Sequence, residues 1–329
     1  MADLESSGRD CVRLKADGVG ERVPARGCGF VHSVFARACN IEMQGGELVT
    51  VLASGLGATP HGIQLEAQPP PFDAWLRTGQ SSVLDGAVLR LPTAGVSVDL
   101  SAASRWRGAV GAASPEDGAT ANRLRTLRAM LCECAPRQGI SLALLPPASS
   151  LTSLQRALAS RLSQVLPMLA RATRRRDIAG MAGSAERLVG LGPGLTPAGD
   201  DFLAGWLATL WSQAALERDL NALLEPLVAA LAPVFRRTHG ISRQMLDDAA
   251  SGCFAQTLVE VTMALAGEGT IARACERALT NGHSSGADAL CGVLFGFAPE
   301  LLLSGKELRA ARAMRSRTGG DTIAPIGSH

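Results

Sequence analysis

The spacing of apolar residues changes along this chain of 329 residues, from a strand-like period to a helix-like one. Up to about residue 110, short runs alternate apolar and polar side chains, as in Val96, Val98 and Leu100. Such alternation is typical of a sheet with one solvated face. From Leu151 onward, leucines recur at every third or fourth position, the period of an amphipathic helix. The sequence therefore predicts an α+β chain with a β-rich N-terminal domain (residues 1–147), a mostly α-helical domain (148–315) and a flexible tail (316–329).

Local signals refine this division. Strands are expected over residues 30–40 and 47–53, joined by a hairpin at Gly45-Gly46, with more strands at 63–67, 82–91 and 96–100. Helices are expected over residues 122–134, 202–216, 220–235, 241–266, 271–279 and 287–303. Ser251-Gly252 is expected to break or bend the longest of these helices.

Composition and charge exclude several classes of function. Hydrophobic residues make up 47% of the chain and charged residues 19%, which predicts a folded core. A net charge of +2 and an aromatic content of 4%, with no Tyr, argue against nucleic acid and against an anionic membrane as partners. The 8 cysteines lack paired CxxC spacing, and the N-terminus is polar, with no signal peptide pattern. We therefore expect a cytoplasmic protein with reduced thiols.

The most informative segment is GLGPGLTPAGDDFLAGWLATL, residues 190–210. Gly192 and Gly194 bracket a proline, which predicts a tight loop. Thr196 followed by Pro197 predicts a helix start, with the hydroxyl as N-cap. A glycine loop that leads into a helix N-terminus presents free N–H groups and the positive end of the helix dipole, so it suits an anion such as phosphate.

Two acids, Asp200 and Asp201, follow Gly199 in the first turn of this helix. They could orient a polar substrate or, together with Asp288, hold Mg²⁺ beside a phosphate. The alternative is that they only complement the helix dipole. No cofactor or metal site is established by these residues alone.

A second segment, residues 281–297 (NGHSSGADALCGVLFGF), repeats the pattern G-x-D-x-L-x-G-x-L. The matched pairs are Gly199 with Gly286, Asp201 with Asp288, and Gly205 with Gly292. Two similar loop-to-helix starts would each aim an acid from their first turns, and a glycine one turn later lets a neighbouring backbone approach. If the two helices cross there, Asp201 and Asp288 face each other. The alternative is coincidence in a domain rich in Gly, Ala and Leu.

Two histidines lie in loops that lead into predicted helices, His239 in THGIS and His283 in NGHSSG. Histidine can act as a base, an acid or an anion donor near neutral pH, although a lone histidine is more often structural. Ser242 is expected to cap the helix that follows it, and Ser284 and Ser285 to cap the last helix or bind an anion. The metal and nucleotide motifs HExxH, DxDxDG and GxxxxGK[ST] are absent.

The strings GLGPGLTPAGDDFLAG, THGIS and GHSSGAD, with VHSVFARACNIE and ELVTVL nearer the N-terminus, resemble the AllH family, which is named for a proposed subunit of bacterial oxamate carbamoyltransferase. The resemblance spans most of the chain. The family usually has Ser where this chain has Ala198. The resemblance implies FdrA-like and AllG-like partner subunits and a role in allantoin breakdown, in which a carbamoyl group moves between oxalurate and phosphate.

The sequence is compatible with three functions. The first is a carbamoyltransferase subunit that binds phosphate, carbamoyl phosphate or a small acid or amide. Gly192, Gly194 and Thr196 would hold the anion, a histidine would polarise the carbonyl or move a proton, and the aspartates would orient the amide. The second is a non-catalytic binding or assembly subunit, and the third is a Mg²⁺-dependent hydrolase. A homo-oligomer is possible in each case.

Overall fold

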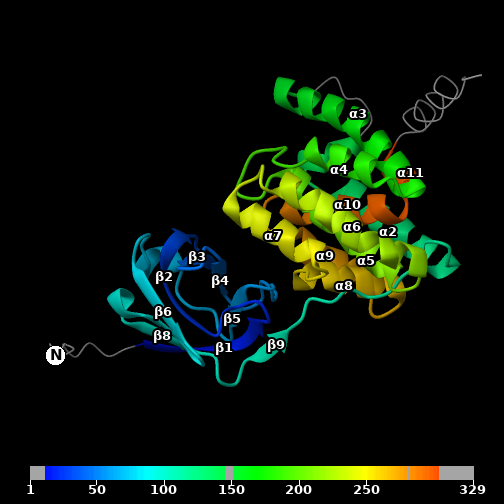
Figure 1. Cartoon of the computed structure of the whole chain (residues 1–329). Helices are drawn as coiled ribbons and strands as arrows, with labels where there is room; N and C mark the ends of the chain where they lie inside the picture. The colour runs from blue at the N-terminus through cyan, green and yellow to red at the C-terminus, as the bar shows by residue number, and fades with distance from the viewer. Residues whose placement is uncertain (1–11, 145–150, 281, 304–329) are drawn as a thin grey trace, which may run out of the picture. The chain divides into compact units, whose positions relative to one another are not determined.

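A computed structural model describes residues 12–144, 151–280 and 282–303 of the chain (Figure 1). Contacts divide it into two compact units, Met1–Val110 with Asp247–Glu260, and Gly111–Leu246 with Val261–His329. The first is built on strands and the second on helices, which confirms the α+β prediction. The expected boundary at residues 147–148 and the expected tail lie outside the described residues, so they stay predictions.

The first unit is a sheet that closes on itself. Its strands are β1 (Val12–Gly20), β2 (Arg26–Val34), β3 (Ala38–Met43), β4 (Leu48–Leu52), β5 (Gly62–Leu65), β6 (Ser81–Asp85), β7 (Val88–Leu91), β8 (Val96–Asp99) and β9 (Ser104–Trp106), with a short helix α1 (Phe72–Trp75) after β5. The strand order is β5-β4-β3-β2-β6-β7-β8-β1-β9, and β5 also pairs with β1. Strand β1 closes the sheet because its first half pairs with β8 and its second half pairs with β5, with a bulge between Ala16 and Gly18 in the pairing to β5.

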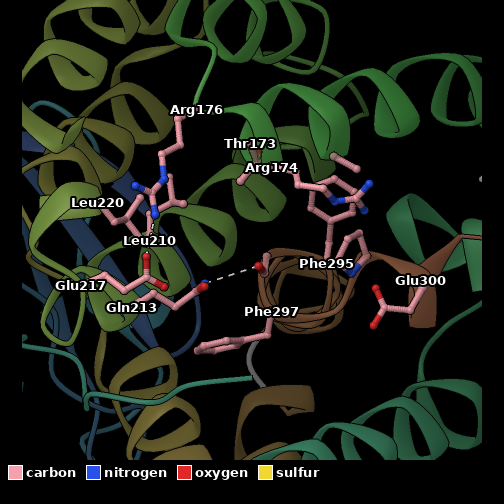
Figure 2. Close-up of a pocket in the computed structure, with 13 residues that line it drawn as sticks. Thr173, Arg174, Arg176, Leu210, Gln213, Glu217, Leu220, Phe295, Phe297 and Glu300 are labelled. Atoms are coloured by element: carbon pink, nitrogen blue, oxygen red, sulfur yellow. Dashed lines mark hydrogen bonds and ion pairs between the residues drawn. The ribbon is translucent and has the colours of Figure 1, made fainter. Parts of the chain in front are cut away.

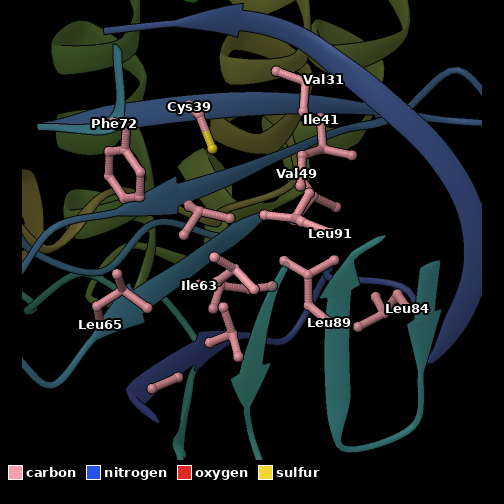
Figure 3. Packing of buried hydrophobic residues seen from close by; sticks show 14 of the residues in the cluster. Val31, Cys39, Ile41, Val49, Ile63, Leu65, Phe72, Leu84, Leu89 and Leu91 are labelled. Carbon is pink, nitrogen blue, oxygen red and sulfur yellow. The ribbon is translucent and has the colours of Figure 1, made fainter. Parts of the chain in front are cut away.

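The core of this unit lies inside the closed sheet. Side chains from strands far apart in the sequence meet there, as Figure 3 shows for Val31, Ile41, Ile63 and Leu89, each fully buried. Along β8, Val96 and Val98 are buried while Ser97 and Asp99 are partly exposed. The alternation read from the sequence therefore reflects an inner apolar face and an outer solvated face.

Two strand predictions need correction. Residues 82–91 do not form one strand, because β6 ends at Asp85 and β7 begins at Val88, and these two strands pair antiparallel. Residues 30–40 do not form a single strand, because β2 ends at Val34 and β3 begins at Ala38. The two strands pair antiparallel, with Val34 opposite Cys39. The connecting residues contain no Gly or Pro, so the turn left no local signal. The hairpin predicted at Gly45-Gly46 is present between β3 and β4, with Gly46 at a φ of 87°.

A buried cluster of charges lies within the first unit. Asp248 is 5% exposed, and its Oδ1 accepts a hydrogen bond from Arg22 Nη1 at 2.8 Å. The same oxygen lies 3.2 Å from His61 Nε2. The contacts join the returning segment Asp247–Glu260 to the sheet and give the buried carboxylate a cationic partner.

The second unit is helical. Its helices are α2 (Gly118–Cys134), α3 (Ser153–Arg175), α4 (Ile178–Glu186), α5 (Ala198–Ala214), α6 (Arg218–Phe235), α9 (Ile271–Leu279), α10 (Ser285–Phe297) and α11 (Pro299–Leu302), with parts of α7 (Gly240–Ala250) and α8 (Gln256–Ala266). The predicted break at Ser251-Gly252 separates α7 from α8. Helices α5 and α10 form the centre of the unit, because nearly every residue of both is buried.

Candidate functional site

Two central helices of the second unit, α5 and α10, run side by side in the same direction. Their N-terminal ends meet, with Thr196 Oγ1 3.3 Å from Ser285 Oγ, and near their C-terminal ends Gln213 Nε2 lies 3.4 Å from the Gly296 carbonyl oxygen. Parallel packing places the positive ends of two helix dipoles together. The paired helix starts expected from the repeated sequence pattern therefore lie next to each other.

Glycines bring the two helices into backbone contact. A Cβ atom added at Gly205 would overlap the carbonyl oxygen of Ala289, and a Cβ added at Gly292 would overlap that of Phe202. The two contacts are equivalent. In the repeated sequence pattern, Gly205 corresponds to Gly292 and Phe202 corresponds to Ala289, so each glycine meets the matching residue of the other helix. The glycine one turn after each aspartate thus has the packing role that the sequence suggested.

The loop before α5 is tight, as expected. Gly190, Gly192 and Gly194 have φ values of 71°, 114° and 106°, which favour glycine. A Cβ added at Gly199 would overlap the carbonyl oxygen of Leu188, so the loop backbone packs directly on the helix start. The Gly199 N–H donates to the Leu191 carbonyl at 2.9 Å, which leaves fewer N–H groups for an anion than the sequence suggested.

The predicted N-cap of α5 is wrong by one residue. Pro197 occupies the N-cap position and Ala198 begins the helix, with no side-chain cap. The Thr196 hydroxyl instead faces the start of α10. Similarly, α7 begins at Gly240, so Ser242 lies inside its first turn, buried, with its Oγ donating to the Leu195 carbonyl at 3.3 Å. Both hydroxyls bind across the structure rather than to the helix that follows them.

Asp200 holds the loop in place. The carboxylate is fully buried, its Oδ1 accepts from the Gly190 N–H at 2.8 Å, and its Oδ2 accepts from Thr238 Oγ1 at 2.6 Å. Both oxygens are therefore engaged within the chain. Thr238, just before His239 in THGIS, was not among the predicted site residues, although its motif was.

Asp201 lies at the junction of the two helix starts, 3% exposed. Burial raises the pKa of its carboxyl well above the usual range, and the negative charge of Asp288 raises it further. The hydroxyls of Ser285 and Thr196 act in the opposite direction. Its Oδ2 is buried and has no hydrogen-bond partner among the described residues.

Asp288 is fully buried in the matching turn of α10. Burial raises the pKa of its carboxyl to about 7, against hydrogen bonds from the Ile140 N–H and the Ser284 hydroxyl that lower it. The Ile140 N–H donates to Oδ1 at 2.6 Å, and Gly139 packs against both oxygens. Its Oδ2 has no hydrogen-bond partner in the described part of the chain. No signal in the sequence pointed to Gly139 and Ile140.

The remaining predicted residues surround this junction. His239 is exposed, with Nε2 3.2 Å from the Gly194 carbonyl oxygen. His283 is exposed in the turn before α10, Ser284 occupies the N-cap position without a side-chain cap bond, and Gly286 is buried in the first turn. The junction therefore has exposed polar residues, His239 and His283, near buried carboxyls.

The carboxylates do not form an evident metal site. Within the described ranges, no three His, Cys, Asp or Glu side chains converge in a way that could hold a metal ion. Asp200 uses both oxygens inside the chain, so the set of Asp200, Asp201 and Asp288 considered for Mg²⁺ lacks one free ligand.

Protonation gives the junction a different chemistry. Asp201, whose carboxyl pKa is raised well above the usual range, holds its proton to a higher pH than an exposed acid, and while protonated it can donate a hydrogen bond rather than repel an anion. Two helix N-termini and the hydroxyls of Thr196, Ser284 and Ser285 add further donors. The junction is therefore suited to oxygen-rich anions or carbonyl groups.

Comparison with known proteins identifies the family. Residues 9–105 match the AllH family N-terminal domain, and residues 188–297 match AllH, described as oxamate carbamoyltransferase subunit AllH. This chain belongs to the AllH family. The second AllH match contains the glycine loop, both helix starts and all three aspartates.

No solved structure matches the chain. Among the described residues of this AllH-family chain, no helix is long and apolar enough to cross a membrane.

Proposed function

We propose that this chain is the subunit of an oxamate carbamoyltransferase-like enzyme that binds phosphate or carbamoyl phosphate at the junction of α5 and α10. The observation that carries the proposal is the meeting of two helix N-termini beside two buried carboxyls, Asp201 and Asp288, whose pKa values are raised with no contribution from a cation among the described residues. Helix N-termini attract anions, and a protonated carboxyl donates to them. The family description supports the subunit role.

Each group has a defined part in the proposed site. Gly192, Gly194 and the Thr196 hydroxyl hold the phosphate oxygens at the rim. Asp201 donates a hydrogen bond from its protonated carboxyl, and the charge of Asp288 helps keep that proton in place. Asp200 acts as a positioning residue, because its oxygens fix Gly190 and Thr238.

The reaction implied by the family needs these functions. A phosphate oxygen attacks the carbamoyl carbon of oxalurate, the bond from that carbon to the oxamate nitrogen breaks, and the nitrogen takes up a proton. His239 or His283, both exposed at the rim, would polarise the carbonyl or move this proton. FdrA-like and AllG-like subunits complete the enzyme in this proposal, which places it in the cytoplasm.

The test is ligand binding by the purified full chain. Phosphate, carbamoyl phosphate, oxamate and oxalurate are compared by thermal shift and calorimetry. A ligand at 100 times its Kd stabilises the fold by about 2.7 kcal/mol. We expect carbamoyl phosphate to bind, and Thr196→Val to weaken it at least tenfold. The control is Thr126→Val, an exposed threonine of α2 far from the junction in sequence, which should leave the affinity unchanged.

The pH dependence provides a second readout. As the pH rises past 7, the Asp288 carboxyl loses its proton and the gained negative charge repels the ligand. Affinity should therefore fall between pH 6.5 and 8.5 in the wild type, and less in Asp288→Asn, whose amide stays neutral.

Two results would overturn the proposal. One is the absence of any shift for the chain alone and in complex with FdrA-like and AllG-like subunits. The other is full carbamoyl transfer by a complex that carries both Thr196→Val and Asp201→Asn. Full activity of that variant complex would instead identify the chain as an assembly subunit.

A further inference from the structure

The segment of residues 238–242 (THGIS), which leads from α6 into α7, is fixed against the glycine loop by two hydroxyl groups. Thr238 Oγ1 donates to Asp200 Oδ2 at 2.6 Å, and the Asp200 carboxylate is fully buried. At the other end of the segment, Ser242 Oγ donates to the Leu195 carbonyl oxygen at 3.3 Å, and Ser242 is also fully buried. His239 lies between these two contacts, so the backbone that carries its side chain is held on both sides.

The imidazole of His239 has a defined tautomer. Its Nε2 lies 3.2 Å from the carbonyl oxygen of Gly194. A carbonyl oxygen only accepts hydrogen bonds, so Nε2 carries the hydrogen. In the neutral ring the other nitrogen, Nδ1, then has a lone pair, and it has no hydrogen-bond partner among the described residues. His239 therefore presents a base at Nδ1.

The second histidine near the junction has no such support. His283 is exposed in the turn before α10, and it makes no hydrogen bond to any other residue in the described part of the chain. The tautomer of a histidine ring is set by the hydrogen bond that one of its nitrogens makes, so nothing selects between the two neutral forms of His283. Of the two histidines, His239 is the one whose proton position the fold determines.

The other end of the α5–α10 pair offers no comparable base. A pocket of about 300 Å³ lies there, between the C-terminal parts of the two helices (Figure 2). The ionisable side chains among the described residues that line it are Arg174, Arg176, Glu217 and Glu300, without a histidine. Histidine is the side chain whose ordinary pKa lies nearest to neutral pH, so the N-terminal end of the pair is the end suited to proton transfer.

We propose that His239 is the catalytic base of the carbamoyl site, acting through Nδ1, and that Thr238 is the positioning residue that sets its tautomer. The inference rests on the proposed function. In the direction from oxalurate, Nδ1 takes the proton of the attacking hydrogen phosphate as the phosphate oxygen bonds to the carbamoyl carbon. Nδ1 then gives this proton to the oxamate nitrogen as the carbon–nitrogen bond breaks. The ring returns to its neutral form, and the two substrates supply every atom.

The tautomer is tested by NMR of the full chain, with ¹⁵N in its histidine rings. At pH 8.5, above the ordinary pKa of histidine, we expect His239 in the Nε2–H form alone and His283 in both neutral forms. Spectra of His239→Gln and His283→Gln assign the two sets of signals. An Nδ1–H form of His239, or the same mixture as in His283, would overturn the proposal. The outcome does not depend on whether carbamoyl phosphate binds.

Variants of Thr238 test the positioning role. Thr238→Val removes the hydroxyl at nearly constant volume, so His239 should adopt the mixture of tautomers shown by His283, whereas Thr238→Ser should keep the single form. Ser242→Ala, which removes the contact at the other end of the segment, is measured in parallel in case Thr238→Val does not fold. Thr126→Val is the matched control. A single Nε2–H form in both Thr238→Val and Ser242→Ala would remove the positioning role.

Turnover by the complex with the partner subunits tests the catalytic role. A positioned base contributes about 100-fold or more to the rate, so His239→Gln should lower kcat by at least that factor and change the KM for oxalurate by less than about threefold. His283→Gln should lower kcat at least tenfold less than His239→Gln, and a larger loss in His283→Gln would overturn the assignment. A wild-type complex without turnover would contradict the proposed function and the base role with it, whereas a wrong tautomer contradicts only the assignment of His239.

Discussion

The two units of this chain differ in how their buried carboxyl groups are paired. In the strand unit, Asp248 accepts a hydrogen bond from Arg22 and lies within 3.2 Å of His61 Nε2. In the helical unit, no cation contributes to the pKa of Asp201 or Asp288 within the described residues, and each has a buried oxygen without a partner there. The first arrangement neutralises the buried carboxylate with a cation, whereas the second leaves two buried carboxyl oxygens without a partner among the described residues.

Ionisation of the buried carboxyl therefore affects the stability of the two units in opposite directions. A buried carboxylate with a cationic partner stabilises the fold only as long as the partner remains, and loss of either member leaves an uncompensated charge. A buried carboxyl without a cation costs stability when it ionises, so its pKa is raised. Replacement of the acid by its neutral amide should therefore have opposite effects in the two units.

The largest expected effect is that of Asp248→Asn. The substitution leaves the Arg22 side chain, which is 33% exposed, without its carboxylate, and we expect the free energy of unfolding to fall by about 2–3 kcal/mol, less than for a fully buried pair. Urea unfolding at pH 7.5 measures it. Asp85→Asn is the control, because Asp85 is 57% exposed and its ion pair with Arg26 should contribute under about 1 kcal/mol. Equal losses of unfolding free energy in both variants would show that the buried Asp248 pair contributes no more than an exposed one, and the proposed contrast between the two units would fail.

Asp288→Asn should act with the opposite sign. The pKa of Asp288 is raised to about 7, so between pH 4 and 7 the folded state holds a proton that the unfolded state releases, and wild-type stability falls as the pH rises. The amide removes this loss, so we expect the variant to be more stable by about 2 kcal/mol at pH 8 and equal to the wild type at pH 4. Unfolding curves at both pH values check it.

Asp99 provides a control for the sign of the pH dependence. The pKa of Asp99 is lowered to about 2 by hydrogen bonds from Ser101 and by Arg13, so its contribution is present above pH 4 and lost as the pH falls towards 2. Asp99→Asn should thus change stability at neutral pH in the direction opposite to Asp288→Asn. A destabilised Asp288→Asn at pH 8 would show that the ionised carboxylate has a favourable partner.

The smallest expected effect is that of Ala198→Ser. The match of the two helix starts pairs Ala198 with Ser285, whose hydroxyl lowers the pKa of Asp201. A hydroxyl at position 198 would face Asp288 in the same way, and we expect about 1 kcal/mol of added stability at pH 8, where the carboxylate form dominates, and less at pH 5. Ser285→Ala should cause a loss of similar size. If Ala198→Ser destabilises the chain as much as Ala198→Val, the two helix starts are not equivalent at this position.

The sequence indicated two similar helix starts because its signal is local and repeated. In each, an aspartate precedes a glycine by one helical turn, so the two residues share a face of their helix; that the two helices pack together was only one of the possibilities. The helical period likewise located α2, α9 and the break between α7 and α8. These features depend on residues within a few turns of one another.

Features that depend on distant contacts were not predictable in this way. The cover of Asp288 by Gly139 and Ile140 joins residues far apart in the chain, and no periodicity reports such a contact. The same is true of Asp248, whose segment returns to the strand unit after the helices have begun. The N-cap at Pro197 in place of Thr196 has another cause, because the hydroxyl binds across to α10 instead of its own helix.

The reciprocal contact of Gly205 and Gly292 also limits how this protein can evolve. A side chain at either glycine would meet the backbone of the other helix, and no single change on the opposite side can make room, because a carbonyl oxygen is present whatever residue bears it. A second mutation elsewhere therefore cannot compensate for a side chain at Gly205 or Gly292 without moving one helix away from the other. Each glycine independently limits which sequences can keep the two helix starts together.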